Sequence, residues 1–189
     1  MEIKRGQIFI LTGPSGVGKT EILKRLLANP SLNLQRVITC TTRAKREGEI
    51  DGKDYFFISK EQFLKELKEN KFFEHAEVYG NYYGSRKDEV EKILHTGKNV
   101  IFQLDPQGAE NLKRMDEHCK VIFIKAENLD SMKDRLLGRN ADSDEALAKR
   151  LAAAQKEIDN SAQFDFVVTN YTGKLGEAVR DIEKIIENS

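Results

Sequence analysis

The feature that most constrains this chain is a glycine-rich loop close to its start. Residues 13–20 read GPSGVGKT, which satisfies the pattern G-x-x-x-x-G-K-[ST]. An apolar run at residues 8–11 precedes the loop, and an amphipathic stretch over residues 22–27 follows it. A strand, a glycine loop and a helix in this order gather backbone N–H groups and the positive end of a helix dipole around one anion. The sequence therefore predicts a site for the phosphates of a nucleoside triphosphate.

Each part of the loop has a physical role in this interpretation. Glycines allow the backbone to wrap tightly around the phosphates. The predicted cradle consists of Gly13, Pro14, Ser15, Gly16, Val17 and Gly18. Lys19 is expected to contact the β- and γ-phosphates and to act in catalysis, and Thr20 is expected to be a ligand of Mg²⁺. The loop leaves the reaction open, because GTPases, ATPases and small kinases all use it.

The rest of the chain alternates short apolar runs with amphipathic stretches, which is typical of a parallel α/β sheet. Compact apolar runs predict buried strands at residues 8–11, 100–104, 121–124 and 166–168. Apolar stripes predict long helices at residues 144–161 and 175–186. We therefore expect an α/β fold of the P-loop NTPase type, with a parallel sheet flanked by helices.

Two capping patterns predict where further helices begin. Ser59 with Gln62 predicts a helix that runs through about residue 69. Ser85 with Asp88 predicts another, which ends near residue 95 with Gly97 as its stop. Residues 37–84 and 135–150 break the alternation, and such segments are typical of functional insertions mounted on a core.

The composition fits one soluble domain. The chain has 189 residues, and its 31 Lys and Arg balance its 31 Asp and Glu. A net charge of zero argues against nucleic acid as a general partner, and no apolar run is long enough to cross a membrane. Cys40 and Cys119 form no metal-type spacing, so we expect buried thiols in a reducing cytoplasm rather than a disulfide. The sequence leaves open whether the chain is a monomer or a homodimer.

Several separated motifs point to one family. Residues 39–49 read TCTTRAKREGE, residues 51–55 read DGKDY and residues 81–85 read NYYGS. Further along, residues 135–139 read RLLGR and residues 149–151 read KRL. In this order, and across nearly the whole chain, these motifs resemble those of the guanylate kinase family.

The resemblance implies one domain in three parts. They are a core of residues 1–36, 86–130 and 152–189, a GMP-binding insertion of residues 37–85, and a short helical lid of residues 131–151. The resemblance also implies transfer of a phosphoryl group from ATP to GMP, and to dGMP, with Mg²⁺ as cofactor. Small nucleotides would then be the partners, with neither nucleic acid nor a membrane involved.

A kinase of this type must hold the phosphate of the acceptor nucleotide. Arg43 and Arg46 match the family's positions and offer planar, bidentate donors, and Arg43 would also act in catalysis. Tyr55 and Tyr83 can add hydrogen bonds without adding charge. With Lys45 between the two arginines, spacing alone would equally fit solvated loop charge. The resemblance favours binding.

Base selection is assigned by the same resemblance. Guanine presents two adjacent N–H donors, which one carboxylate can accept, and the family's carboxylate falls on Glu74. Hydroxyl groups that contact the base fall on Thr39 and Ser85, and the family usually has serine where Thr39 stands. Without the resemblance, Glu74 would be interpreted as an exposed carboxylate on a strand.

The expected lid carries three arginines. Arg135, Arg139 and Arg150 match the family's catalytic lid positions and could neutralise the transferring group. Arg135 and Arg139 are four residues apart and would share one face of a helix. The alternative is surface charge paired with nearby aspartates.

The chain departs from the family's pattern at two places. Gln103 stands where the first of two acidic residues is expected, and the second, Asp105, is kept and assigned to the substrate site. Since an amide brings no negative charge, we expect weaker catalysis if that acid orders the metal's water ligands. Asn170 is expected beside the adenine of ATP, and Tyr171 follows it where the family tends to have aspartate.

Two other functions remain as alternatives. One is a guanylate-kinase-like module that binds a nucleotide or a protein with weak or no turnover. Such modules usually lack a working phosphate loop, whereas Lys19 and Thr20 are present here. The other is a kinase of a different nucleoside monophosphate.

Overall fold

The computed structural model describes residues 4–78, 80–137 and 144–189. Contacts between residues divide the chain into two compact units. The small unit comprises Met1–Gln7 with Gln35–Val100, and the large unit comprises Ile8–Leu34 with Ile101–Ser189.

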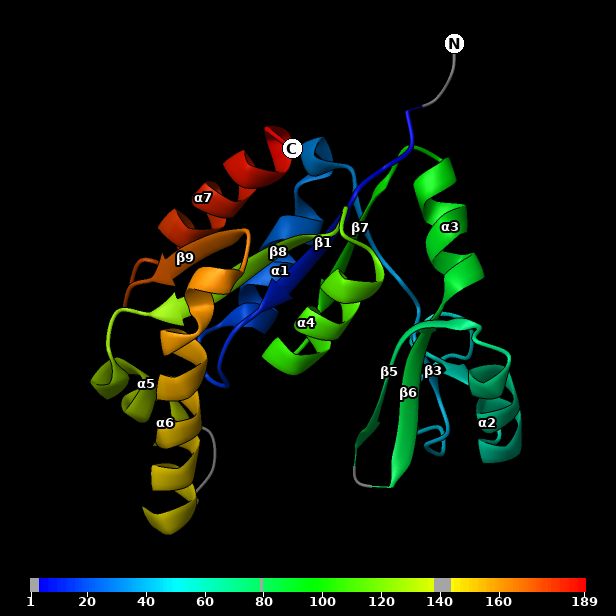
Figure 1. The fold of residues 1–189 in the computed structure, drawn as a ribbon, viewed down its shortest axis with the longest axis horizontal. Helices are drawn as coiled ribbons and strands as arrows, with labels where there is room; N and C mark the ends of the chain where they lie inside the picture. Colours follow the sequence, from blue (N-terminus) through cyan, green and yellow to red (C-terminus); the bar gives the residue numbers. More distant parts are fainter. Residues whose placement is uncertain (1–3, 79, 138–143) are drawn as a thin grey trace. The chain divides into compact units, whose positions relative to one another are not determined.

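A five-stranded sheet has the strand order β2-β7-β1-β8-β9 (Figure 1). Its strands are β1 (Ile8–Thr12), β2 (Leu34–Arg36), β7 (Asn99–Gln103), β8 (Lys120–Ala126) and β9 (Phe166–Asn170). The pairs β1–β8 and β8–β9 are parallel. Every residue of β1 is buried, as expected for a strand covered on both faces.

Helices pack their apolar faces against this sheet. They are α1 (Lys19–Ala28), α4 (Pro106–Met115), α5 (Leu129–Leu137), α6 (Asp144–Asp159) and α7 (Leu175–Glu187), with short 3-10 turns at Pro30–Leu32 and Ser161–Gln163. Phe9 and Leu11 of β1 belong to one buried cluster with Leu26 of α1 and Ile182 of α7. The phosphate loop therefore connects a buried strand to a helix that packs in the same core.

The small unit holds a four-stranded sheet of order β4-β3-β6-β5. Its strands are β3 (Cys40–Thr41), β4 (Phe56–Phe57), β5 (Phe72–Val78) and β6 (Asn81–Arg86), and its helices are α2 (Lys60–Lys68) and α3 (Lys87–His95). β5 and β6 form an antiparallel hairpin, which is interrupted by a register shift between Phe72 and Glu74. The small core gathers Cys40, Phe63 of α2 and Phe72.

Most of the local predictions hold. The four predicted strands correspond to β1, β7, β8 and β9. Ser59 caps α2 by accepting a hydrogen bond from the Gln62 backbone N–H at 3.1 Å. The helix predicted to end at Ser161 ends at Asp159, and Ser161 begins a 3-10 turn.

The predicted cap at Ser85 is wrong. Ser85 lies inside β6, and α3 begins only at Lys87, after Arg86. The Ser85 hydroxyl donates to Glu74 Oε1 at 2.7 Å. A serine three residues before an acidic side chain occurs both at helix starts and in strands, and here the strand pairing decided between them. The helix α4 was not predicted, although Asp105 before Pro106 is a strong start signal.

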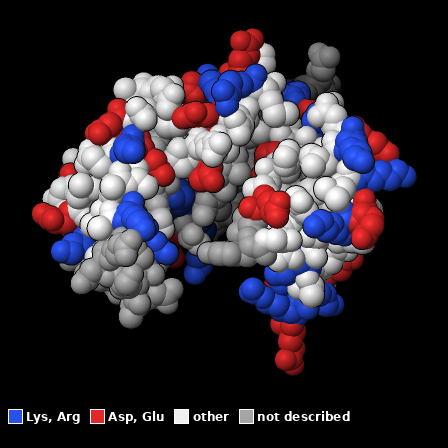
Figure 2. Space-filling model, turned by 60° about the horizontal axis from the view of Figure 1, so that its bottom comes forward, with Lys and Arg blue, Asp and Glu red and all other residues white. Residues whose placement is uncertain are grey.

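The charged side chains of the described residues are interspersed on the face that Figure 2 presents, in keeping with the balanced composition. None of the helices within residues 4–78, 80–137 and 144–189 is both long and apolar enough to span a membrane.

Both cysteines are free and buried, as the sequence predicted. Cys40 and Cys119 are each 0% exposed, and burial raises the pKa of each thiol to about 12. At pH 8, below these values, both groups stay protonated, and only the thiolate is nucleophilic. We expect no reaction with Ellman's reagent in the folded protein and reaction of both thiols in guanidinium chloride. Fast labelling of either cysteine in the folded protein would contradict this placement.

Candidate functional site

The phosphate loop of the large unit has a backbone that only glycine adopts easily. Gly13, Gly16 and Gly18 have φ angles of 135°, 85° and 96°. A Cβ atom at Gly13 would lie 2.1 Å from the carbonyl oxygen of Ile124 in β8. The loop thus lies directly against β8, and α1 begins immediately after Gly18. This geometry gathers N–H groups around an anion at the start of a ten-residue helix.

Lys19 is folded back across the loop. Its Nζ donates to the carbonyl oxygens of Gly13 at 2.5 Å and of Pro14 at 2.8 Å. The ammonium group is therefore held next to the hollow in which phosphates would lie. The contact of Lys19 with the β- and γ-phosphates stays a prediction.

The predicted metal ligand Thr20 has one neighbour at the end of β7. Thr20, the first residue after Lys19, is exposed. Gln103, at the end of β7, donates from Nε2 to Thr20 Oγ1 at 3.4 Å. Asp105 is exposed, and its Oδ1 accepts from the Gly108 backbone N–H at 2.7 Å, which caps α4. Hydroxyl and carboxylate oxygens are ligands that Mg²⁺ accepts, usually together with water and phosphate oxygens.

Asn170 holds the backbone of the phosphate loop by a hydrogen bond. It ends β9, is 4% exposed, and donates from Nδ2 to the carbonyl oxygen of Val17 at 2.8 Å. A Cβ atom on Gly18 would lie 2.8 Å from the same amide nitrogen. The structure therefore brings Asn170 to the loop backbone, while the neighbouring Tyr171 is 48% exposed.

Sequence patterns alone did not point to Glu157 on α6. Its Oε2 is buried and has no hydrogen-bond partner among the described residues. Burial raises the pKa of this carboxyl, the charge of Lys19 opposes the rise, and the charge of Asp105 adds to it. Glu157 thus belongs to the electrostatic surroundings of the loop. No local sequence pattern marks Glu157, because its setting depends on residues far away in the chain, Lys19 and Asp105.

The predicted lid arginines are only partly described. Arg135 lies within α5, and Arg150 is exposed on α6. Arg139 lies outside the described residues. α5 and α6 contact each other, so two of the three lid positions belong to neighbouring helices.

In the small unit, the Arg43 side chain is held by a carboxylate, a backbone carbonyl and two aromatic rings. Its two terminal nitrogens donate to the two carboxylate oxygens of Glu49 at 3.1 and 2.7 Å, and one of them also donates to the Ala44 carbonyl at 2.7 Å. The guanidinium lies 5.4 Å from the ring centre of Tyr55 and 5.8 Å from that of Phe57. Hydrogen bonding to Arg43 lowers the pKa of the Glu49 carboxyl. Arg43 is therefore oriented on both sides and is largely buried.

Glu49 also organises the loop around Arg46. It accepts a hydrogen bond from the Arg46 backbone N–H at 2.7 Å, while the Arg46 side chain is exposed. Tyr55 and Tyr83 face each other edge to face, with ring centres 6.2 Å apart. The structure thus gathers Arg43, Tyr55 and Tyr83 and leaves the Arg46 side chain at the rim.

The predicted base-binding carboxylate has a fixed partner. Glu74 lies opposite Ser85 in the β5–β6 pairing and accepts its hydroxyl hydrogen bond at 2.7 Å. Ser85 is 1% exposed, and Glu74 is half-buried. Thr39 is half-buried before β3, where its carbonyl accepts from the Phe56 N–H at 3.0 Å. One Glu74 oxygen is engaged by the sheet, and its orientation is set by Ser85.

Comparisons with known proteins bear on these two half-sites. A profile of the family described as guanylate kinase matches residues 5–189. The chain belongs to the guanylate kinase family. A curated guanylate kinase of Clostridium tetani is 40% identical over 184 residues, which cover 97% of this chain and 86% of that protein. A guanylate kinase of Rickettsia bellii is 41% identical over 186 residues, which cover 98% of this chain and 96% of that protein.

Solved structures agree with this family. A crystal structure of guanylate kinase from Anaplasma phagocytophilum matches with a TM-score of 0.71 at 31% identity, covering 100% of this chain and 88% of that chain. An uncharacterized protein from Eubacterium ventriosum matches with a TM-score of 0.51 at 15% identity, which shows the fold alone. The predicted fold class and the predicted resemblance to guanylate kinases are both confirmed.

We expect Asn170→Ala to weaken binding of the phosphoryl donor. The substitution leaves the Val17 carbonyl without its buried donor, and such a loss costs about 1–3 kcal/mol. The KM for the nucleoside triphosphate should rise about tenfold, with little change in the KM for the acceptor. Asn188→Ala is a matched control, because that amide also donates to a backbone carbonyl, Lys184 at 2.7 Å, but at the exposed end of α7. An unchanged donor KM in Asn170→Ala would show that the loop does not need this support.

Proposed function

We propose that this chain transfers the terminal phosphoryl group of ATP to the phosphate of GMP, and of dGMP, with Mg²⁺ as cofactor. The observation that carries the proposal is the complete phosphate loop with Lys19 folded across it. A module that binds only a protein has no need of this lysine. The small unit carries arginine, tyrosine and carboxylate side chains that could bind a second nucleotide, the acceptor.

The donor half-site would hold the triphosphate through the backbone N–H groups of the loop and through Lys19. Thr20 is the residue that would hold Mg²⁺, directly or through a water ligand, while Asp105 keeps its assignment to the substrate site. When bound, Mg²⁺ supplies positive charge beside the phosphates. Asn170 would keep the loop backbone in place from the opposite side.

The acceptor half-site would hold the phosphate of GMP through Arg43 and Arg46, with Tyr55 and Tyr83 adding hydrogen bonds. Arg43 already lies beside both tyrosines. Because Glu49 and the Tyr55 ring fix the guanidinium, little side-chain entropy is lost when the phosphate binds.

Glu74 would select the base. Its carboxylate can accept the two adjacent N–H groups of guanine, while Thr39 and Ser85 contribute hydroxyls. Adenine lacks this pair of donors on the same edge, so it would leave the buried polar groups unpaired. Sites built in this way discriminate strongly, because each unpaired group costs free energy.

Phosphoryl transfer depends on positioning and on neutralising charge. The attacking atom is an oxygen of the acceptor's own phosphate, so no protein nucleophile is needed. Lys19, Arg43 and the lid arginines Arg135, Arg139 and Arg150 are the groups proposed to neutralise the transferring phosphoryl group. Closure of the lid would also exclude water, which could otherwise take the phosphoryl group.

A coupled assay of ADP formation with GMP, dGMP, AMP, CMP and UMP tests this function. We expect GMP and dGMP to be preferred over the other acceptors by at least about 100-fold in kcat/KM. Lys19→Ala should lower kcat at least about 100-fold with the fold retained by circular dichroism. If no ADP forms with any of the five acceptors, the chain is a binding module, and preference for an acceptor other than GMP or dGMP would indicate a different kinase.

We expect Gln103→Asp to raise kcat or leave it unchanged. The added carboxylate would face Thr20, where it could order the water ligands of Mg²⁺. Turnover measured against Mg²⁺ concentration is the readout. Gln107→Asp is the matched control, because it adds the same charge to the exposed first turn of α4. A large loss of kcat in Gln103→Asp alone would show that the chain depends on the amide.

A further inference from the structure

The β5–β6 hairpin carries a bulge at the predicted base-binding residues. Phe72 lies opposite Arg86, and Glu74 lies opposite Ser85, so two steps along β5 match one step along β6. The extra residue is Phe73. Without the bulge, regular pairing would place Phe73 opposite Ser85 and turn the Glu74 side chain to the other face of the sheet. The bulge is therefore what aims Glu74 at the Ser85 hydroxyl.

The strand beside the bulge approaches it closely. A Cβ atom at Gly84 would lie 2.9 Å from the Phe72 ring and 3.0 Å from the carbonyl oxygen of Glu74. A side chain at this position would push the two strands apart. The distance between β5 and β6 at Glu74 is thus set by contact, and anything that shifts β6 shifts Ser85 relative to Glu74.

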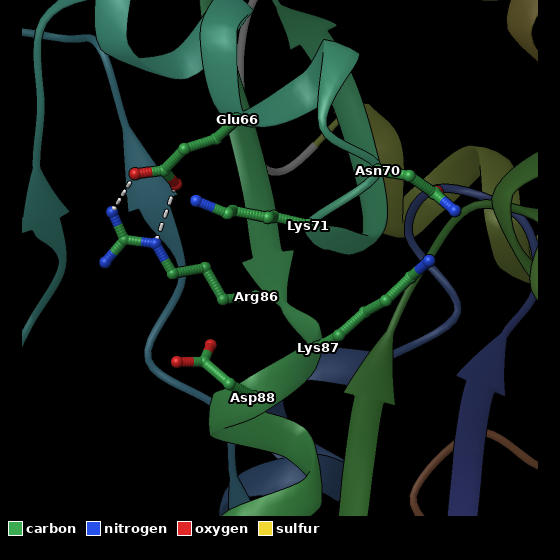
Figure 3. A pocket seen from close by; sticks show the side chains of 6 residues that line it. All are labelled: Glu66, Asn70, Lys71, Arg86, Lys87 and Asp88. Atoms are coloured by element: carbon green, nitrogen blue, oxygen red, sulfur yellow. Dashed lines mark hydrogen bonds and ion pairs between the residues drawn. The ribbon is translucent and has the colours of Figure 1, made fainter.

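The opposite face of the hairpin is clamped by an ion pair with α2. Arg86 donates from Nε to Glu66 Oε2 at 2.8 Å and from a terminal nitrogen to Glu66 Oε1 at 2.7 Å (Figure 3). The side chains are only 21% and 11% exposed. Gln62 donates to the same carboxylate at 3.0 Å, and the Arg86 guanidinium lies 5.7 Å from the ring centre of Phe56.

A ring stack on the same face completes the clamp. Phe72 stacks on Phe63 of α2 with ring centres 4.3 Å apart. Directly after Arg86, the backbone N–H of Lys87 donates to the Lys71 carbonyl at 2.8 Å. Both strands at the bulge are therefore tied to α2 or to the segment that follows it.

We propose that Glu66 and Arg86 are positioning residues for guanine recognition. Their ion pair links β6 to α2 and thereby holds the bulge that aims Glu74 and Ser85 at the base. This inference rests on the proposed function, in which Glu74 and Ser85 bind guanine. In this proposal neither Glu66 nor Arg86 touches the nucleotide. Since successive side chains of a strand point to opposite faces, Arg86 acts from the face opposite to Ser85.

The surroundings of the pair make it testable by substitution. Glu66 and Arg86 line a pocket of about 490 Å³ together with Asn70, Lys71, Lys87 and Asp88 (Figure 3). Water can enter the space left by a shortened side chain there, so loss of the pair need not open an empty cavity. The matched control is Arg5→Met, because Arg5 forms an exposed ion pair with Glu91 at 2.8 Å in the same unit.

The experiment separates positioning from stability. The single variants Arg86→Met and Glu66→Met each break the fork and leave the other charge mostly buried and unpaired, so both are expected to lower the Tm. The double variant Glu66→Met/Arg86→Met replaces both partners by apolar side chains of similar length, and such a replacement is often close to neutral for stability. We expect its Tm to recover toward that of the wild type.

Recovery of stability should not restore recognition. In the double variant the KM for GMP should stay about tenfold higher than in the wild type, with the KM for ATP and kcat unchanged. Arg86→Lys, which keeps the charge but not the fork, should be intermediate. Arg5→Met should leave every kinetic parameter unchanged. A double variant with wild-type KM for GMP would overturn the inference and make the pair purely structural.

Glu74→Gln distinguishes this failure from failure of the proposed function. If Glu74→Gln leaves the preference for GMP over AMP unchanged, the assignment of Glu74 to guanine is wrong, and the inference falls with it. If Glu74→Gln loses that preference while the double variant binds GMP normally, only the role of Glu66 and Arg86 is wrong. If both raise the KM for GMP and leave the KM for ATP unchanged, both assignments stand.

Discussion

The close contact between the phosphate loop and β8 is the constraint on which the donor half-site depends. No side chain fits at Gly13, because a Cβ atom there would meet the Ile124 carbonyl at 2.1 Å. The sheet consequently fixes the loop backbone, and Lys19 and Asn170 add hydrogen bonds to its carbonyls. The strand order then determines what surrounds it, since β7 ends at Gln103 beside Thr20 and β9 ends at Asn170 beside Val17. The ends of two strands, β7 and β9, thus meet the loop.

In the small unit, contacts between side chains, rather than between backbone segments, hold the predicted binding groups in place. Two bidentate Arg–Glu forks orient its charged groups: Arg43 with Glu49, and Arg86 with Glu66. The first fork belongs to the predicted phosphate site and the second to the opposite face of the hairpin. In both, a largely buried guanidinium is satisfied by a carboxylate, which avoids the cost of an unpaired buried charge.

The sequence predicted the features that depend on neighbouring residues better than those that depend on contacts between distant residues. The loop at residues 13–20, the positions of the four strands and the Ser59 cap each depend on neighbours in the chain, and each was predicted correctly. The predicted burial is wrong for β9, which lies at the edge of the sheet with Val167 40% exposed. The role of Ser85 was misread as a helix cap, because its partner Glu74 is eleven residues away across a hairpin. The bulge, the Glu66–Arg86 fork and the setting of Glu157 depend on contacts between separate elements, and no local pattern encodes those.

The two modes of recognition also differ in how they tolerate substitution. A backbone nest binds phosphate whatever the intervening side chains, provided that the glycines remain, so its motif stays readable in sequence. A carboxylate aimed at a base depends on register, because a one-residue slip turns every side chain of the strand to the other face. Glu74 faces Ser85 only because the extra residue Phe73 shifts the register of β5. The direction of the Glu74 side chain therefore depends on residues that are not proposed to contact a ligand. Changes in base preference in this fold are accordingly expected to arise behind the sheet as well as on its binding face.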